Sequence, residues 1–163
     1  MSSEGTHAHE TRGTLDAAGV RVAILVARFN SEITERLLEG ARACLAEHGS
    51  AEGSVDVHWV PGAWELPQAA ARVSESGRYD AIVTLGCVIR GETPHFDYVC
   101  EEANRGLGIV ARESRAPLVF GVLTTDDHAQ ALARAGEGPA NKGYEVASAA
   151  LQMVALYRKV GGP

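Results

Sequence analysis

Four short apolar runs, each followed by a polar loop and a helical pattern, constrain the fold of this chain most strongly. The runs cover residues 20–27, 55–60, 81–89 and 117–123. Continuous apolar strands that alternate with helices are typical of a parallel sheet with helices on both faces. We therefore predict an α/β fold, a three-layer α/β/α sandwich whose sheet has four parallel strands, formed by a single domain of residues 20–160.

The helical segments follow the strands at regular intervals. Helices are predicted at about 31–48, up to 76 after the second strand, at 95–114, up to 135 after the fourth strand, and at 141–159. In the first helix, apolar residues recur at spacings of three and four and give one buried stripe, which consists of Ile33, Leu37, Leu38, Ala41 and Leu45. Residues 1–19 lack this periodicity, so we predict a mobile N-terminal tail with the capacity to add a strand to a neighbouring subunit.

The composition limits the partners and the compartment. The 163 residues carry a formal net charge of -6, which argues against nucleic acid and anionic membranes as partners. No apolar run approaches the roughly 20 residues of a membrane helix, and the polar N-terminus does not resemble a secretory signal. Cys44, Cys87 and Cys100 are odd in number and lie in apolar segments, as expected of reduced thiols. We therefore expect a cytoplasmic protein.

Each strand is followed by a loop with unusual side chains. The loops contain residues 28–30 (RFN), 61–65 (PGAWE), 90–95 (RGETPH) and 124–128 (TTDDH). The carboxyl ends of parallel strands lie at one edge of a sheet, where the ligands of open α/β sheets bind. We therefore expect all four loops to converge on one binding site.

Aromatic and acidic side chains in the first two loops are candidates for binding a planar ligand with hydroxyl groups. Phe29 directly follows a strand and suits stacking on a ring, although a core position at the strand end is an equal alternative. Trp64 suits the same role, with simple packing as the alternative. Glu65 can accept hydrogen bonds from substrate hydroxyls, or it serves only as a first-turn carboxylate favoured by the helix dipole.

The third loop combines a proton carrier with groups suited to an anion. His95 begins a helix, and histidine is the residue type most often used for proton transfer, so it is the candidate for that role and Asp97 is a candidate to orient it. Residues 90–93 place a cation, a glycine, a carboxylate and a hydroxyl at a helix N-terminus, where anions bind. Arg134 and Lys142 are candidates for further positive charge. Each of these interpretations has an alternative without a ligand. Lys142 could be an ordinary solvated surface lysine, and residues 90–95 could form a polar surface loop with no binding role.

Several common chemistries lack their motifs. No glycine cluster follows the first strand, which excludes the dinucleotide fingerprint and the phosphate-binding loop of nucleotide hydrolases. No Cys-x-x-Cys or His-Glu-x-x-His pattern indicates a metal, and His7 and His9 in the tail are better explained as solvated side chains. Cys87 lies within an apolar run, which favours a buried, inert thiol over a nucleophile.

Five sequence blocks in one order carry a family resemblance. They are residues 60–67 (VPGAWELP), 88–99 (VIRGETPHFDYV), 120–125 (FGVLTT), 134–136 (RAG) and 141–143 (NKG). Over about residues 20–158 the chain resembles the 6,7-dimethyl-8-ribityllumazine synthases of riboflavin biosynthesis. The resemblance implies a flavodoxin-like strand order and a transferase that uses no metal and no cofactor. The implied reaction condenses 5-amino-6-(D-ribitylamino)uracil with 3,4-dihydroxy-2-butanone 4-phosphate to give 6,7-dimethyl-8-ribityllumazine, phosphate and water.

The resemblance also implies a role for each matching residue. His95 would be the proton donor and acceptor. The ribitylaminouracil would be bound by Phe29, Asn30, Ala63, Trp64, Glu65, Cys87, Val88, Ile89 and Phe120. The butanone phosphate would be bound by Glu92, Thr93, Arg134 and Lys142. Trp64 replaces the phenylalanine that is common at its position and keeps an aromatic ring there. A carboxylate at Glu92 is unfavourable beside a phosphate, so we expect only its backbone N–H to face the ligand.

The resemblance implies an assembly with shared active sites. The family builds pentamers, and some members assemble these into a 60-subunit icosahedral shell. Phe120 would reach into the site of the neighbouring subunit. The short link at residues 137–140 resembles that of shell formers, whereas Pro139 adds a constraint that shell formers need not share. We expect a homopentamer. Whether pentamers assemble further into the 60-subunit shell is left undecided by the sequence. Riboflavin synthase is a candidate partner.

Two other functions stay open on the sequence alone. The same fold could hold a flavin or a lumazine without turnover, although a pure binder has no need of His95, Arg134 and Lys142 together. A Schiff-base enzyme with Lys142 as its covalent amine is the second alternative.

Overall fold

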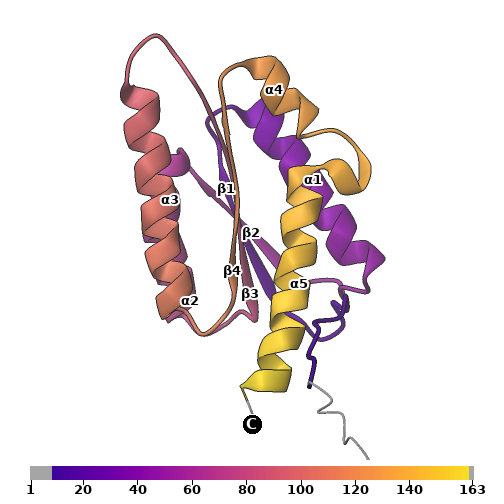
Figure 1. Ribbon diagram of the computed structural model, residues 1–163. Helices are drawn as coiled ribbons and strands as arrows, with labels where there is room; N and C mark the ends of the chain where they lie inside the picture. Colours follow the sequence, from indigo (N-terminus) through magenta and orange to yellow (C-terminus); the bar gives the residue numbers. More distant parts are fainter. Residues whose placement is uncertain (1–8, 162–163) are drawn as a thin grey trace, which may run out of the picture.

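A four-stranded parallel sheet lies between two layers of helices in the computed structural model, which describes residues 9–161 (Figure 1). The strands are β1 (Val22–Ala27), β2 (Val55–Val60), β3 (Ala81–Ile89) and β4 (Leu118–Thr125). Their order in the sheet is β2-β1-β3-β4, and every pairing is parallel. The predicted α/β sandwich with a four-stranded parallel sheet in flavodoxin-like order is thus confirmed.

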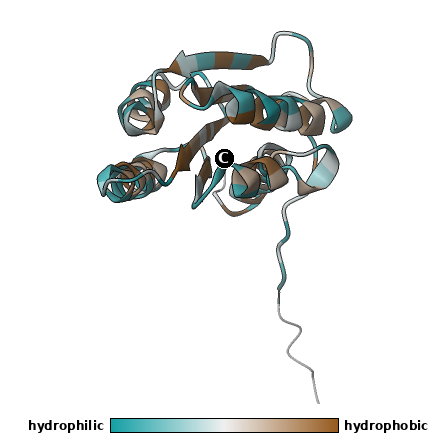
Figure 2. Cartoon of the chain, turned by 90° about the horizontal axis from the view of Figure 1, so that it is seen from above, coloured by the Kyte–Doolittle hydropathy of each residue, from teal (hydrophilic) through white to brown (hydrophobic). Residues whose placement is uncertain are grey.

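Helices cover both faces of this sheet. One face carries α1 (Ser31–Glu47), α4 (His128–Ala133) and α5 (Lys142–Val160), and the other carries α2 (Leu66–Glu75) and α3 (His95–Glu113). Two short 3-10 helices, η1 (Ala63–Glu65) and η2 (Gly138–Ala140), precede α2 and α5. Figure 2 shows hydrophobic and hydrophilic colours on each helix, as expected of elements with one buried face.

The two inner strands form the centre of the core. All six residues of β1 and the first seven of β3 are buried, because helices cover both sides of these strands. Side chains alternate between the faces: Ile24 and Val83 pack towards α1 and α5, whereas Leu25 and Ile82 pack towards α2 and α3. Because a slip by one residue would exchange the two faces, this alternation fixes the register and brings the carboxyl ends of the strands to one edge.

Close contact between α1 and α5 fixes the link that joins α4 to α5. A Cβ atom at Gly143 would lie 1.8 Å from the carbonyl oxygen of Leu37, so only glycine allows this approach. Asn141 caps α5 by accepting a hydrogen bond from the N–H of Gly143, and its Nδ2 donates to the carbonyl oxygen of Arg36. The entry to α5, where Lys142 lies, is therefore anchored to α1.

The fourth strand is longer than predicted. Thr124 and Thr125 pair with Val88 and Ile89 of β3, so both threonines belong to β4 and not to the predicted loop. Asp127 then caps α4. The loop after β4 is consequently short.

The described part of the predicted tail packs against the domain. Ala17 is fully buried, and its N–H donates to the carbonyl oxygen of His48 at the end of α1. Lys159, near the end of α5, donates to the carbonyl oxygen of Arg12. These contacts tie Arg12 and Ala17 to the domain, and the boundary at residue 20 stays a prediction. Residues 1–8, with His7, lie outside the described residues, and the addition of a tail strand to a neighbour stays a prediction.

Candidate active site

A cavity of about 540 Å³ lies at the carboxyl ends of β1, β2 and β3. It brings together most of the residues predicted to bind ligands, namely Phe29, Ala63, Trp64, Glu65, Cys87, Val88, Ile89, Thr93 and His95. Three of the four loops expected at this edge thus contribute to one cavity. The loop after β4 does not line it, which corrects the expectation that all four loops converge on the same site.

Phe29 and Trp64 present large rings to the cavity and are not core residues. Phe29 is 70% exposed and Trp64 is 51% exposed. Neither the core position considered for Phe29 nor the simple packing considered for Trp64 fits these values. Because exposed aromatic rings gain free energy when another surface covers them, the two rings suit a planar ligand. Glu65 is half-buried and lines the same cavity.

Asn30 fixes the loop that carries Phe29. Its backbone has a φ of 60°, in the left-handed region that asparagine tolerates better than most residues. Its Nδ2 donates to the carbonyl oxygen of Cys87 at 2.9 Å, and the Phe29 N–H donates to the carbonyl oxygen of Pro61 at 3.0 Å. The loop after β1 is thus tied to the ends of β3 and β2. Asn30 itself does not line the cavity, unlike the expectation from the sequence.

His95 is exposed at the first position of α3 and lines the cavity. No side chain caps this helix, so the N–H groups of its first turn are not taken by a side-chain acceptor. Thr93 and Gly91 line the cavity immediately before the helix. A proton carrier and a helix N-terminus that favours anions therefore lie next to each other.

Arg90 does not present a free positive charge. Its Nε donates to Asp126 at 3.1 Å, and its Nη1 donates to Asp97 at 3.3 Å. Two carboxylates share this guanidinium, which corrects the expectation of a cation available to an anionic ligand. The expectation that Asp97 orients His95 is corrected as well, because Arg90 is the partner that the structure records for Asp97.

Cys87 is a buried thiol at the end of β3. Burial raises the pKa of this thiol to about 11, since desolvation disfavours the thiolate. A thiol with this pKa is almost fully protonated near neutrality and is a poor nucleophile. This supports the interpretation of Cys87 as an inert thiol whose backbone, and not its sulfur, contributes to the site.

Four further predicted residues do not line the cavity of this single chain: Glu92, Phe120, Arg134 and Lys142. Arg134 and Lys142 lie together, since the Lys142 N–H donates to the carbonyl oxygen of Arg134 at 2.8 Å. The Lys142 ammonium is bound by both carboxylate oxygens of Glu145, at 2.8 and 2.9 Å. Phe120 lies on the edge strand β4 and is 40% exposed.

Sequence reasoning did not single out four of the lining residues as ligand contacts: Pro61, Gly62, Phe96 and Val99. Val99 follows His95 by four positions on α3, so the helical period places both on one face and could have identified it. Pro61 and Gly62 belong to a loop already expected at this edge. No sequence pattern marks Phe96 as a lining residue. Its ring contacts the Arg90 guanidinium, and this contact becomes apparent only in the folded chain.

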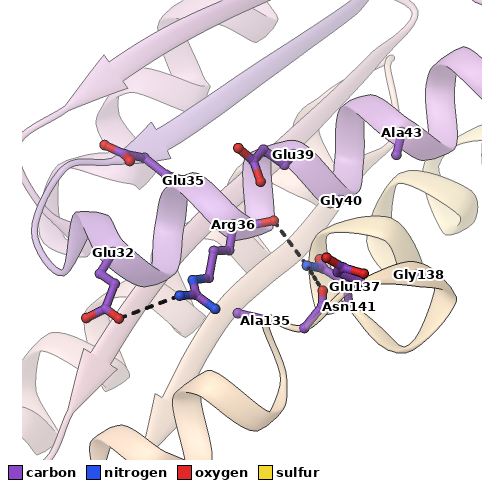
Figure 3. Close-up of a pocket in the computed structure, with 11 residues that line it drawn as sticks. Glu32, Glu35, Arg36, Glu39, Gly40, Ala43, Ala135, Glu137, Gly138 and Asn141 are labelled. Atoms are coloured by element: carbon purple, nitrogen blue, oxygen red, sulfur yellow. Dashed lines mark hydrogen bonds and ion pairs between the residues drawn. The ribbon is translucent and has the colours of Figure 1, made fainter.

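A second cavity, of about 610 Å³, lies between α1 and the link that joins α4 to α5 (Figure 3). Its lining includes the exposed glutamates Glu32, Glu35, Glu39 and Glu137, and Arg36 pairs with Glu32 at 3.8 Å. No residue predicted for the site lines it. The candidate active site is therefore the cavity at the strand ends.

Two features are absent from residues 9–161. Within this range no group of three or more His, Cys, Asp or Glu side chains is arranged to hold a metal ion. Within the same range no helix has the length and apolar character needed to cross a membrane.

Comparison with known proteins decides the family. A family model described as 6,7-dimethyl-8-ribityllumazine synthase matches residues 19–158. A 6,7-dimethyl-8-ribityllumazine synthase of Chlorobium chlorochromatii (strain CaD3) is 45% identical over 154 residues, which cover 94% of this chain and 99% of that protein. The chain belongs to the 6,7-dimethyl-8-ribityllumazine synthase family. The resemblance seen in the five sequence blocks is thereby confirmed, and with it the prediction of a transferase of this family.

The part of the chain matched to the lumazine synthase family includes every residue that lines the cavity, from Phe29 to Val99. It also includes Phe120, Arg134 and Lys142, which the single chain leaves outside the cavity. The residues predicted for the site therefore all lie within the family domain.

Proposed function

We propose that this protein condenses 5-amino-6-(D-ribitylamino)uracil with 3,4-dihydroxy-2-butanone 4-phosphate and releases 6,7-dimethyl-8-ribityllumazine, phosphate and water. One observation carries the proposal: a cavity with two exposed aromatic rings also contains an exposed histidine at an uncapped helix N-terminus. Such a cavity offers a stacking surface, a proton carrier and an anion site together.

The pyrimidine half of the site lies at the ends of β1, β2 and β3. In the proposal, Phe29 stacks on the pyrimidine ring, and Trp64 contacts the ribityl chain and nearby ring atoms, since both aromatic rings are exposed at the cavity. Glu65 accepts hydrogen bonds from the ribityl hydroxyls. Ala63 and Cys87 have buried side chains, so in the proposal both contribute through backbone groups. Val88 and Ile89 complete this wall through backbone groups.

The phosphate half lies at the start of α3. Thr93 lines the cavity there, and the N–H groups of the first turn carry the positive end of the helix dipole. Glu92 contributes its backbone N–H, with its exposed carboxylate turned to solvent. Arg134 and Lys142 lie side by side but outside the cavity of their own chain, so in the proposal they reach the phosphate in the cavity of a neighbouring subunit, where Arg134 pairs with it and Lys142 assists.

The proposed reaction needs several proton transfers and no oxidant. The 5-amino group attacks the ketone carbon, and loss of water gives an imine. A proton leaves the adjacent carbon, phosphate departs, and the ribityl-bearing nitrogen attacks the carbonyl that forms, with loss of a second water. His95 is placed to accept and return these protons at the cavity. Holding both reactants in one cavity can contribute up to about 7–11 kcal/mol to the lowering of the barrier.

The assembly is part of the proposal. Phe120 is exposed on an edge strand and lies outside the cavity of its own chain, which fits a side chain that completes the cavity of a neighbour. We propose a homopentamer with active sites shared in this way. The 60-subunit shell and an interaction with riboflavin synthase stay predictions from the resemblance.

The first test mixes the purified protein with both substrates and follows lumazine absorbance and phosphate release together. Equal rates of the two signals are expected. In Arg134→Ala the KM for the butanone phosphate should rise roughly 30-fold, because a hydrogen bond between charged groups contributes about 2 kcal/mol. A bound yellow ligand without turnover would instead support a flavin or lumazine binder.

The shared site has its own test. His95→Ala and Phe120→Ala subunits, each poorly active alone, are refolded together. If Phe120 serves the neighbouring cavity, mixed oligomers contain some sites with both native residues and regain turnover. If Phe120 served its own chain, no mixture would exceed the activity of the separate variants.

The Schiff-base alternative is disfavoured by the contacts of Lys142. A Schiff-base lysine must be a neutral amine, whereas this ammonium is held by both oxygens of Glu145. Borohydride treatment in the presence of the butanone phosphate should leave Lys142 unmodified. A covalent adduct detected by mass spectrometry would restore the alternative.

A further inference from the structure

Arg90 makes four contacts at the point where β3 ends. The backbone N–H of Arg90 donates to the carbonyl oxygen of Thr125 at 2.9 Å. Its Nε donates to Asp126 at 3.1 Å, and its Nη1 donates to Asp97 at 3.3 Å. Its guanidinium carbon also lies 4.3 Å from the centre of the Phe96 ring.

These contacts join two segments that the backbone alone leaves separate. Phe96 and Asp97 belong to the first turn of α3, whereas Thr125 and Asp126 lie at the end of β4 and in the loop to α4. The planar guanidinium suits this position, since it can stack on a ring while its N–H groups point to two different carboxylates. The ammonium group of a lysine is not planar and does not hold its N–H groups in a fixed arrangement.

The first turn of α3 is the part of the helix that carries the site. His95 and Phe96 both line the cavity, and Arg90 contacts Phe96 and Asp97, the two residues that follow His95. This turn has no side-chain cap of its own. Arg90 therefore contacts the helical turn that carries His95 through the two residues after it.

We propose that Arg90 is a positioning residue, which holds the first turn of α3 against the end of β4 and thereby sets where His95 meets the substrate. This inference rests on the proposed function for its catalytic consequence. The charge of Arg90 is shared by two carboxylates, so the residue acts through His95 and not by binding an anion itself.

The expected effect is on kcat more than on KM. Misplacement of a reacting group by about 1 Å can lower a rate roughly 100-fold. Arg90→Gln removes the guanidinium contacts but keeps the backbone hydrogen bond to Thr125, so only part of this displacement is expected and kcat should fall about tenfold. The KM for the pyrimidine should change less than twofold, since Phe29 and Trp64 lie on other loops.

Three variants separate positioning from a general effect on the fold. Arg90→Lys keeps the positive charge but lacks the planar guanidinium with its fixed N–H directions. Its kcat should therefore fall almost as much as that of Arg90→Gln. Asp126→Asn, at a side chain 69% exposed, weakens one tether without threatening the fold and should lower kcat two- to threefold. The matched control is Arg72→Gln, since Arg72 makes a comparable surface pair with Glu75 on α2 and should leave kcat unchanged.

A second readout does not depend on turnover. The ring resonances of His95 are assigned by NMR from their absence in His95→Ala. They should shift in Arg90→Gln and stay unchanged in Arg72→Gln.

The outcomes are distinct. If the wild-type protein turns over and Arg90→Gln keeps its kcat, the positioning role is wrong while the proposed function stands. If the wild type does not turn over, the proposed function fails, and the NMR comparison still decides the inference: unchanged His95 resonances in Arg90→Gln overturn it. A fall in kcat with shifted resonances supports both.

Discussion

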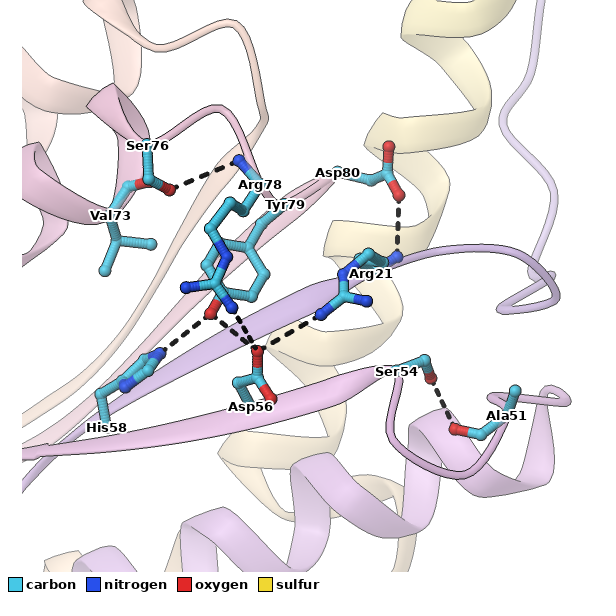
Figure 4. Close-up of polar contacts among 10 residues, drawn as sticks. All are labelled: Arg21, Ala51, Ser54, Asp56, His58, Val73, Ser76, Arg78, Tyr79 and Asp80. Carbon is cyan, nitrogen blue, oxygen red and sulfur yellow. Dashed lines mark hydrogen bonds and ion pairs between the residues drawn. The ribbon is translucent and has the colours of Figure 1, made fainter.

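The two ends of the sheet are built in opposite ways. At the amino ends of the strands, polar side chains bond to one another (Figure 4). The Tyr79 hydroxyl donates to Asp56 at 2.8 Å and lies 3.2 Å from Nε2 of His58. Arg21 and Arg78 complete the group, with ion pairs to Asp56 at 3.5 and 3.8 Å. We call these five residues the Asp56 cluster.

At the carboxyl ends, the cavity presents groups that the rest of the chain leaves exposed. Phe29 and Trp64 are more than half exposed, and the first turn of α3 has no side-chain cap. The Asp56 cluster contains more ionisable groups than this cavity, yet its charges satisfy each other. The comparison teaches that the number of charged residues does not mark a site, because side chains that bind one another leave little for a ligand.

The largest effect on this comparison is expected from removing His95, the proposed proton carrier. His95→Ala should lower kcat on the order of 100-fold, since general acid–base catalysis typically contributes at least that much. Binding of the pyrimidine should change little, because the stacking rings remain. The measurement is steady-state kinetics together with a titration of pyrimidine binding.

The control for this variant is another exposed histidine near the same edge. His128 pairs with Glu32 at 3.1 Å and does not line the cavity, so His128→Ala should keep the wild-type kcat. A wild-type rate in His95→Ala, or an equal loss in both variants, would show that proton transfer at His95 does not limit turnover.

A smaller effect is expected from the tether that holds Phe29. Asn30→Gly keeps the left-handed backbone and loses the hydrogen bond to Cys87, whereas Asn30→Ala loses the bond and also strains the backbone. Both should raise the KM for the pyrimidine about fivefold, as one hydrogen bond contributes about 1 kcal/mol. Both variants lose the hydrogen bond to Cys87, but Asn30→Ala should unfold at a lower urea concentration than Asn30→Gly, because only alanine strains the left-handed backbone.

The comparison of these two variants separates the hydrogen bond of Asn30, which is proposed to position Phe29, from the left-handed backbone of Asn30. If Asn30→Gly has the wild-type KM, the bond to Cys87 does not position Phe29. If both variants bind equally poorly but are equally stable, the backbone conformation at Asn30 carries no strain that glycine relieves.

Much of the fold follows from local signals in the sequence. The inner strands β1 and β3 are continuous apolar runs between helices, and this pattern alone predicts their buried place in a parallel sheet. The end of β4 was not predictable in this way. Thr124 and Thr125 have the composition of a helix cap, and only their pairing with β3 makes them part of the strand.

The site was predicted less completely, because several of its interactions join distant parts of the chain. The positive charge of Arg90 resembles that of an anion-binding residue until its partner Asp126, 36 positions later, is known. The same limit applies to Phe29, whose stacking and core alternatives differ only in exposure. Side chains that a neighbouring subunit would supply cannot be placed from one chain.

The smallest effect is expected at the Asp56 cluster, and it should appear in stability and not in turnover. The hydrogen bond from the Tyr79 hydroxyl, with Arg21 and Arg78, holds the pKa of the Asp56 carboxyl below its ordinary value of 3.8. Burial and the bond to Asp56 raise the pKa of Tyr79 above its ordinary value of 10.0. Tyr79→Phe should therefore lower the urea midpoint at pH 7 and leave kcat unchanged.

The sign of the pH dependence follows from the two pKa directions. A carboxyl whose pKa is lowered on folding contributes stability above its unfolded pKa, and this stability is lost as the pH falls through its folded pKa. A phenol whose pKa is raised on folding contributes stability below its unfolded pKa, and this stability is lost as the pH rises through its folded pKa. The difference between wild type and Tyr79→Phe should thus be largest between about pH 4 and 10 and should vanish well below pH 3.8. A difference that persists at pH 2 would mean that the Tyr79 hydroxyl stabilises the fold without the ionised Asp56 carboxyl. A lower kcat in Tyr79→Phe would mean that the two ends of the sheet are not independent, because a change at one end would then reach the other.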